Sequence, residues 1–271
     1  MSVSKLKNAT LTHRNFLCVG LDPDLEKLPE GLPKNASGVV SFLKEIISAT
    51  QDFCVSYKIN FAFFEALGAD GWHALEATRK LLPETHFLIA DAKRGDIGNT
   101  AKKYAEAIFG QLDFDAVTLS PYMGRDVADP FLAYDEKTAI LLALTSNEGS
   151  RDFQLSKLVN GQHAFEEVLA KSASWGNSEN LMYVVGATKP EYFQTVRKHV
   201  PDHFLLVPGV GAQGGSLVDV YKNGASTNVG LLVNSSRGII YAGSRKDFAM
   251  KAREKAKILA NEMQELMVTV K

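Results

Sequence analysis

The segment FLIADAKRGDIGNTAKKYAEAIF, residues 87–109, has the pattern of one strand, one loop and one helix. It begins with the apolar run 87–90, and a short run without polar alternation is typical of a parallel strand covered on both faces. A polar stretch follows, and after it Ala105, Ile108 and Phe109 recur at the spacing of one helix face. The segment therefore predicts a βα unit.

Apolar runs of the same kind recur along the whole chain. They cover 16–21, 53–59, 87–90, 116–119, 139–144, 181–185, 204–207 and 230–233. Successive runs begin about 31 residues apart on average, which is the length of a βα unit. We therefore predict an α/β fold, a (β/α)8 TIM barrel that forms a single domain over residues 1–271. A doubly wound parallel sheet remains the alternative, because periodicity does not show that the sheet closes.

The widest interval between runs follows the fifth run. It contains a second polar loop and a stretch, 165–173, with the spacing of a helix. We therefore expect the loop after the fifth strand, about 146–180, to be enlarged. No linker or low-complexity segment interrupts the pattern.

Composition argues against several classes of protein. The 30 Lys and Arg residues nearly balance the 31 Asp and Glu residues, so we expect no nucleic-acid partner. No apolar stretch approaches the ~18 residues of a membrane span, and residues 1–17 lack the apolar core of a signal peptide. Cys18 and Cys54 lie in apolar runs and are expected to be free buried thiols. These features predict a cytoplasmic protein with no membrane partner.

Charged residues directly follow the third run, at Asp91, Lys93 and Asp96. In a barrel, chemistry takes place at the carboxyl ends of the strands. Positions two apart face the same side of a strand, so Asp91 and Lys93 share one side. Neighbouring carboxylates favour a protonated lysine, which can donate a proton to carbon or stabilise a carbanion. The alternative is a salt-bridge cluster at a helix N-terminus, without chemistry.

Lys58 interrupts the second apolar run, and Asn60 lies two residues further on the same side. A charged side chain within a barrel strand needs a partner, and Asp91 on the adjacent strand is the expected one. The pattern predicts an alternating array of Lys58, Asp91, Lys93 and Asp96. Chance placement of Lys58 at a frayed strand end is the alternative.

The motif G-x-G-x-x-G covers 209–214, after the seventh run. A dinucleotide site would need this motif in the first βα unit and an acidic residue about 20 positions later, and neither is found. We therefore favour a phosphate site made by the loops after strands seven and eight, with Gln213 and Arg237 as donors. A tight turn beside an exposed arginine is the alternative. No histidine pair has the spacing of a metal site, so no metal is expected.

The segment DAKRGDIGNT, residues 91–100, resembles the signature of the orotidine 5′-phosphate decarboxylases, and most closely their longer-chain bacterial subgroup. The resemblance extends over nearly the whole chain. It includes GLDP at 20–23, YKIN at 57–60, LTSN at 144–147, PGVG at 208–211 and SRG at 236–238. The D-x-K-x-x-D core alone is shared with relatives of different activity, whereas the ordered set of motifs is more specific.

This resemblance implies a homodimer that decarboxylates orotidine 5′-phosphate to UMP, the last step of de novo pyrimidine nucleotide synthesis. It implies no metal and no organic cofactor. Lys93 would protonate carbon 6 of the pyrimidine as carbon dioxide leaves, and Asp91 and Asp96 would flank the reacting carboxylate. Lys58 would hold Asp91 and contact the ribose.

The resemblance also implies the substrate-binding residues. They are Asp22 for a ribose hydroxyl, Ser146 for the pyrimidine edge, Gln213, Arg237 and the backbone near Gly238 for the phosphate, and further Asn60 and Pro208. Asp96, Ile97 and Thr100 would reach into the site of the partner subunit.

Three other functions are weighed against this one. A Schiff-base aldolase using Lys93 or Lys58 would need an unprotonated lysine, which neighbouring acids disfavour. A magnesium-dependent sugar-phosphate decarboxylase of the same fold would want an acid where Lys58 stands. A non-catalytic nucleotide-binding protein would bind UMP without converting its precursor.

Overall fold

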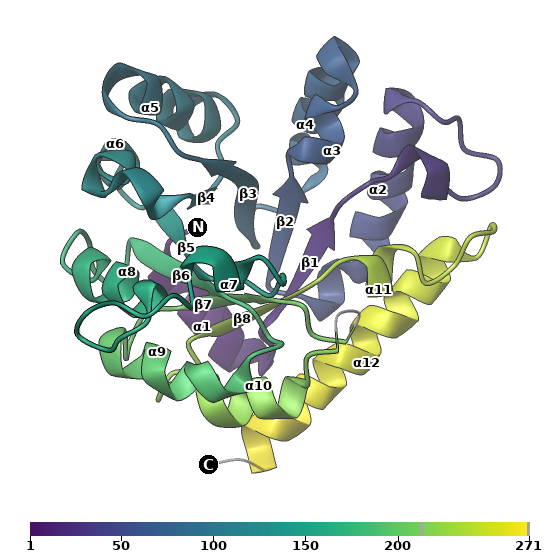
Figure 1. Cartoon of the computed structure of the whole chain (residues 1–271). Coiled ribbons are helices and arrows are strands. Elements are labelled where there is room, and N and C mark those ends of the chain that lie inside the picture. The colour runs from purple at the N-terminus through teal and green to yellow at the C-terminus, as the bar shows by residue number, and fades with distance from the viewer. Residues whose placement is uncertain (212–213, 270–271) are drawn as a thin grey trace.

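Eight parallel strands form one closed barrel in the computed structural model, which describes residues 1–211 and 214–269 (Figure 1). The strands are β1 Leu17–Leu21, β2 Ser56–Asn60, β3 Phe87–Arg94, β4 Ala116–Leu119, β5 Thr138–Leu144, β6 Leu181–Val185, β7 Leu205–Pro208 and β8 Leu231–Ser235. Each strand pairs with its neighbour in the chain, and β8 pairs with β1. The predicted (β/α)8 barrel is confirmed, and the doubly wound sheet is wrong because the sheet closes.

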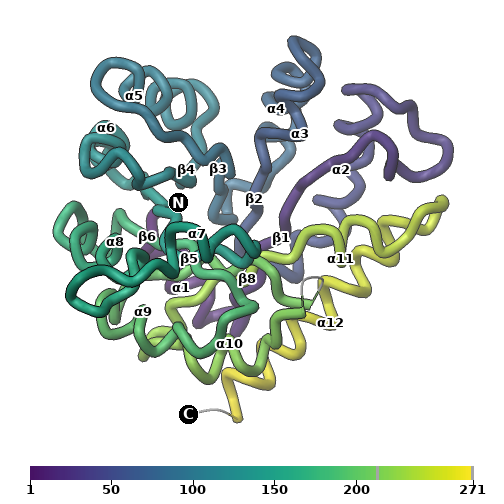
Figure 2. The backbone as a smooth tube through the Cα atoms, viewed as in Figure 1, coloured from purple at the N-terminus to yellow at the C-terminus, as the bar shows by residue number. Residues whose placement is uncertain are grey.

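Helices surround the barrel and lie in the loops that join its strands. They are α2 Ala36–Thr50, α3 Ala62–Glu65, α4 Gly68–Leu81, α5 Gly98–Ala105, α6 Asp129–Leu132, α7 Ser150–Phe153, α8 Ala164–Ser172, α9 Phe193–His199, α10 Leu217–Gly224, α11 Arg237–Ile240 and α12 Phe248–Thr269, with α1 Val3–His13 preceding β1. The last helix, α12, packs against α2, so the two ends of the helical layer meet (Figure 2).

Two apolar clusters lie on the two sides of the strands. Because successive strand residues face opposite sides, Leu17 and Val19 pack in the outer cluster beneath the helices, whereas Cys18 faces the barrel interior. Val3 and Leu6 of α1 belong to the interior cluster, so α1 covers the end of the barrel where the strands begin. The opposite end, where the strands finish, is left for a site. Both cysteines are buried and free, as predicted.

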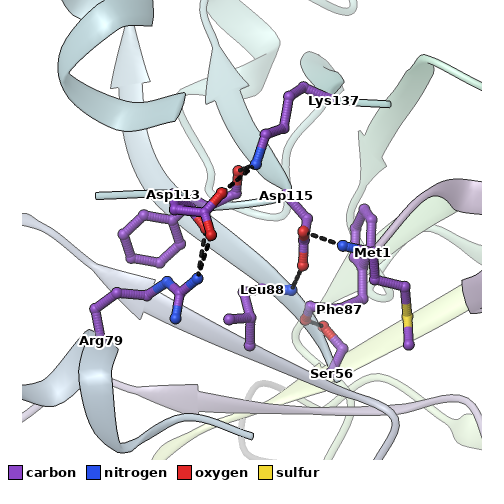
Figure 3. Close-up of polar contacts among 9 residues, drawn as sticks. Met1, Ser56, Arg79, Phe87, Leu88, Asp113, Asp115 and Lys137 are labelled. Carbon is purple, nitrogen blue, oxygen red and sulfur yellow. Dashed lines mark hydrogen bonds and ion pairs between the residues drawn. The ribbon is translucent and has the colours of Figure 1, made fainter. Parts of the chain in front are cut away.

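Polar contacts hold the loops at the covered end, where strands β4 and β5 begin (Figure 3). Asp115, just before β4, accepts a hydrogen bond of 2.8 Å from the N–H of Leu88 and forms an ion pair with the amino group of Met1. Lys137, just before β5, donates a hydrogen bond of 2.7 Å to Asp113. These contacts fix where both strands start.

The strand boundaries agree with the apolar runs to within a few residues, except in β3. That strand continues to Arg94, four residues past the run, and its pairing with β4 shifts register between Ala90 and Arg94. Asp91 and Lys93 therefore lie within the strand instead of following it. An apolar run underestimates a strand whose last residues face a polar cavity, because those positions need not be apolar.

The chain between β5 and β6 forms α7 and α8, and α8 coincides with the predicted helix at 165–173 to within one residue. The side chain of Gln154, just after α7, accepts a hydrogen bond of 2.7 Å from the N–H of Thr145. Lys189, after β6, donates a hydrogen bond of 2.5 Å to the hydroxyl of Ser150 in α7. These bonds tie the segment to the ends of the two strands that flank it.

Arg197 of α9 links several main-chain segments that precede β7 and β8. Its guanidinium donates hydrogen bonds to the carbonyl oxygens of Gly224 (2.7 Å), Val200 (3.2 Å), His203 (2.6 Å) and Gly230 (2.8 Å). Burial lowers the pKa of Arg197 to about 10, which still leaves it charged at neutral pH. One side chain thus satisfies the acceptors of two loops.

We predict that Arg197→Met lowers the free energy of unfolding by about 3 kcal/mol, because buried carbonyl oxygens lose their donor and each such loss costs about 1–3 kcal/mol. Urea unfolding followed by circular dichroism measures the change.

Arg253→Met is the matched control. The side chain of Arg253 is 48% exposed, and its ion pair with Asp52 spans 3.3 Å. An exposed pair of this kind contributes at most about 1 kcal/mol. Equal destabilisation by the two substitutions would contradict the role assigned to Arg197.

Candidate active site

A cavity of about 310 Å³ opens at the carboxyl ends of the strands. The predicted site residues that line it are Asp22, Lys58, Asn60, Asp91, Lys93, Ser146, Pro208 and Arg237. They come from the first, second, third, fifth, seventh and eighth strands and the loops that follow them. Residues far apart in the sequence are therefore brought into one site, as expected for this fold.

The floor of the cavity has a polar side and an apolar side. Inward-facing Lys58, Asp91 and Thr118 come from the consecutive strands β2, β3 and β4. On the other side, β5, β6 and β7 contribute inward-facing apolar side chains; these are Leu142, Val184 and Leu206. A flat ring could pack on the apolar side while the charged groups face its edge.

Lys58 is bound by two carboxylates. Its Nζ atom lies 2.8 Å from Oδ2 of Asp91 and 3.6 Å from Oδ1 of Asp22, and its side chain is 6% exposed. Burial disfavours the ammonium, but the two carboxylates outweigh burial and hold the pKa of Lys58 well above its usual value. The predicted partnership of Lys58 with Asp91 is therefore present.

Asp91 lies between two lysines, because Oδ1 accepts a hydrogen bond of 2.5 Å from Nζ of Lys93 while Oδ2 accepts one from Lys58. Burial disfavours the carboxylate, but the two ammonium groups hold the pKa of Asp91 well below its usual value. The carboxylate is thus charged at neutral pH. Removing the buried Lys58 would leave part of that buried charge unpaired, which is strongly destabilising.

Lys93 has an unusual backbone for a side chain with a Cβ atom. Its φ is +45°, in the left-handed region, and it lies inside the register shift between β3 and β4. Such a conformation is disfavoured by about 1 kcal/mol or more and persists where the surroundings hold it. The Lys93 side chain is 51% exposed, so its ammonium is accessible from the cavity.

Asp96, Ile97 and Thr100 do not join the array within one chain. β3 ends at Arg94, and the carboxylate of Asp96 does not line the cavity but accepts a hydrogen bond of 2.8 Å from the N–H of Ile97. Ile97 and Thr100 are exposed at the start of α5. Lys58, Asp91 and Lys93 therefore form a continuous ion-paired group, and Asp96 stands apart from it.

The loop after β7 and the start of α11 line the same cavity through Pro208, Gly209 and Arg237. Gly209 has a φ of +99°, a backbone conformation that favours glycine. Gly238 is adjacent to Arg237 but does not line the cavity, and Gln213 lies outside the described residues. The arginine and the glycine-containing loop are thus placed together, as a phosphate site would require.

Several cavity residues were not assigned to the site from the sequence, among them Thr118 on β4 and Asn234 on β8. Asn234 is buried, and no partner to its Oδ1 is found among the described residues. A Cβ atom on Gly20 would lie 3.0 Å from that oxygen, so glycine leaves room for the amide. Strand alternation could have indicated both residues, because each follows an inward-facing position by two.

Among the described residues, no group of three or more His, Cys, Asp and Glu side chains is placed to hold a metal ion. Within the same part of the chain, no helix has both the length and the apolar character needed to cross a membrane. The absence of a cofactor stays a prediction from the resemblance.

Comparisons with known proteins identify the family. Residues 15–252 match the orotidine 5′-phosphate decarboxylase / HUMPS family. The orotidine 5′-phosphate decarboxylase of Flavobacterium johnsoniae is 54% identical over 270 residues, which cover 98% of each chain. That of Phocaeicola vulgatus is 53% identical over 257 residues and 94% of each chain.

A solved structure extends the agreement to the fold. The structure of Leishmania donovani OMP decarboxylase superposes with a TM-score of 0.88 at 36% identity, and each chain is covered completely. From the matched family and the identity to its bacterial members over nearly the full length, we conclude that the chain belongs to the orotidine 5′-phosphate decarboxylase / HUMPS family.

Proposed function

We propose that this enzyme, a carboxy-lyase of its family, converts orotidine 5′-phosphate to UMP and carbon dioxide by protonation from Lys93, without a cofactor. The observation that carries the proposal is the ion-paired group of Lys58, Asp91 and Lys93 in the cavity that Arg237 also lines. This would be the last step of de novo pyrimidine nucleotide synthesis, in the cytoplasm.

The reaction breaks the bond between carbon 6 of the pyrimidine and its carboxylate. Carbon dioxide leaves, the electron pair stays on carbon 6, and a proton from the Lys93 ammonium takes the place of the lost group. A catalyst accelerates this step only where it binds the transition state more strongly than the substrate. The attraction of the Lys93 ammonium grows as negative charge develops on carbon 6, so it meets this condition.

Asp91 and Lys58 support the chemistry of Lys93. Asp91 accepts a hydrogen bond from the Lys93 ammonium and so holds that group at the cavity. Lys58 and Asp22 extend the array toward β1, where hydroxyl groups of a ribose would find both a donor and an acceptor. Ser146, which lines the cavity, would contact the pyrimidine edge.

Arg237 would bind the phosphate with the loop after β7, away from the reacting carbon. A guanidinium presents paired donors to phosphate oxygens. Binding energy from such a remote group can orient the ring against Lys93 and so lower the barrier. Asn60 and Pro208 complete the substrate contacts that we propose in the cavity.

We expect Lys93→Ala to abolish turnover, with binding of UMP partly retained, because the phosphate and ribose contacts remain. Ultraviolet absorbance of orotidine 5′-phosphate in excess EDTA measures turnover, and calorimetric titration with UMP measures binding. Conversion in EDTA by the wild-type protein would also exclude an essential exchangeable metal.

Lys80→Ala is the control, since the Lys80 side chain is 71% exposed and pairs with Glu76 on α4. Near-normal turnover by Lys93→Ala would refute the mechanism. Turnover by the wild-type protein of a sugar phosphate, only after magnesium is added, would identify the sugar-phosphate decarboxylase instead. Tight UMP binding without any turnover would identify a binding protein.

We further propose that the enzyme is a homodimer whose sites share residues across the interface. Asp96, Ile97 and Thr100 are outside the cavity of their own chain and adjoin each other at the start of α5. Ile97 is 48% exposed and is therefore accessible to a second chain. In the dimer, these residues of one subunit would complete the substrate site of the other subunit, with Asp96 beside the reacting carboxylate.

A hybrid of two defective chains tests this arrangement. Lys93→Ala and Asp96→Ala chains are co-expressed with different tags, and dimers carrying both tags are purified. Because one of the two sites in the hybrid is intact, we expect about half of the wild-type turnover per dimer, whereas each parent variant is defective. A hybrid no more active than its parents would show that Asp96 does not act across an interface.

A further inference from the structure

We infer that Thr118 on β4 is a positioning residue, which holds the backbone of Lys93 and the carboxylate of Asp91 through one hydroxyl group. The inference rests on the proposed role of Lys93 and adds a residue that the motif does not contain. Thr118 is 27 positions away from Asp91 along the chain and is brought beside it by the pairing of β3 with β4.

The hydroxyl of Thr118 makes two hydrogen bonds at once. Its Oγ1 atom accepts a bond of 2.9 Å from the N–H of Lys93 and donates one of 3.1 Å to Oδ1 of Asp91. A hydroxyl has a single hydrogen to donate, so donation to the carboxylate leaves the oxygen lone pairs for the Lys93 N–H. The side chain is 1% exposed, and water does not compete for either bond.

The register shift explains why Lys93 needs this acceptor. The paired residues of β3 and β4 are Ile89 with Ala116, Ala90 with Val117 and Arg94 with Leu119. Lys93 falls in the gap between the last two pairs, where it adopts its left-handed backbone. The Thr118 side chain supplies the acceptor that a regular strand would supply from its main chain. Loss of the hydroxyl would leave the Lys93 N–H without this bond and release a disfavoured conformation.

The same hydroxyl fixes the direction of the Asp91 carboxylate. Oδ2 of Asp91 is held by Lys58, and Oδ1 receives both Thr118 and the ammonium of Lys93. The carboxylate plane is therefore held from both oxygens, and the ammonium of Lys93 is held at a defined place. Because Thr118 contacts the backbone of Lys93 and the carboxylate that binds its ammonium, it sets the position from which the proton would be delivered.

We test the inference with Thr118→Val, which keeps the shape of the side chain and removes both hydrogen bonds, and with Thr118→Ser, which keeps the hydroxyl. We expect Thr118→Val to lower kcat about 10- to 100-fold, since small displacements of a catalytic group have effects of this size. KM should change less than about threefold, because substrate contacts remain. Thr118→Ser should restore most of kcat.

Thr138→Val is the matched control, since Thr138 is buried at the start of β5 and its Oγ1 has no hydrogen-bond partner among the described residues. It should leave kcat unchanged. A Thr118→Val enzyme with normal kcat, or a Thr118→Ser enzyme as defective as Thr118→Val, would overturn the inference. So would a raised KM with kcat unchanged, which would make Thr118 a substrate contact.

A second measurement separates this inference from the proposed mechanism. Amide hydrogen exchange at Lys93, read by NMR, should become at least about tenfold faster in Thr118→Val and stay near the wild-type rate in Thr118→Ser. This readout does not need turnover. If Lys93→Ala retains activity, the mechanism fails while the exchange result still decides whether Thr118 holds Lys93. Unchanged exchange in Thr118→Val would overturn the inference, even if that variant is less active.

Discussion

The site is organised around the charge of Asp91 inside the barrel. Its carboxylate is bound by Lys58 on one oxygen and by Lys93 on the other, so a buried anion is balanced by two cations. A single buried charge would be expensive to desolvate, whereas a paired and hydrogen-bonded group is tolerated. The position of each lysine is therefore tied to a carboxylate that cannot move without exposing charge to an apolar interior.

The rest of the barrel places this charged group at one side of a cavity that a substrate can enter. The lower interior is filled by apolar side chains such as Ile140 and Met182, which are fully buried. Above them, the polar residues occupy one side of the ring of strands and the apolar residues the other. In the proposed reaction, the flat base of the substrate would lie on the apolar side and the charged groups would face its edge.

Much of this architecture could be predicted from the sequence. Eight apolar runs at the spacing of βα units indicated the barrel, and the adjacency of strands two and three indicated the pairing of Lys58 with Asp91. Both predictions follow from the spacing and the order of the apolar runs in the sequence. Sequence spacing could not reveal the left-handed backbone of Lys93 or its bond to Thr118, because they depend on a register shift between two strands. It also predicted one array of Lys58, Asp91, Lys93 and Asp96, whereas the ion pairs among the described residues do not include Asp96.

Helix α1 limits the route by which substrate and product can reach and leave the active site. Val3 and Leu6 fill the end of the barrel where the strands begin, so that end offers no passage. The nucleotide must enter and leave through the mouth at the carboxyl ends of the strands. A site with a single opening cannot bind a new substrate molecule while the nucleotide product still occupies it. Release of product through that mouth is thus a step that every catalytic cycle has to complete before the next begins.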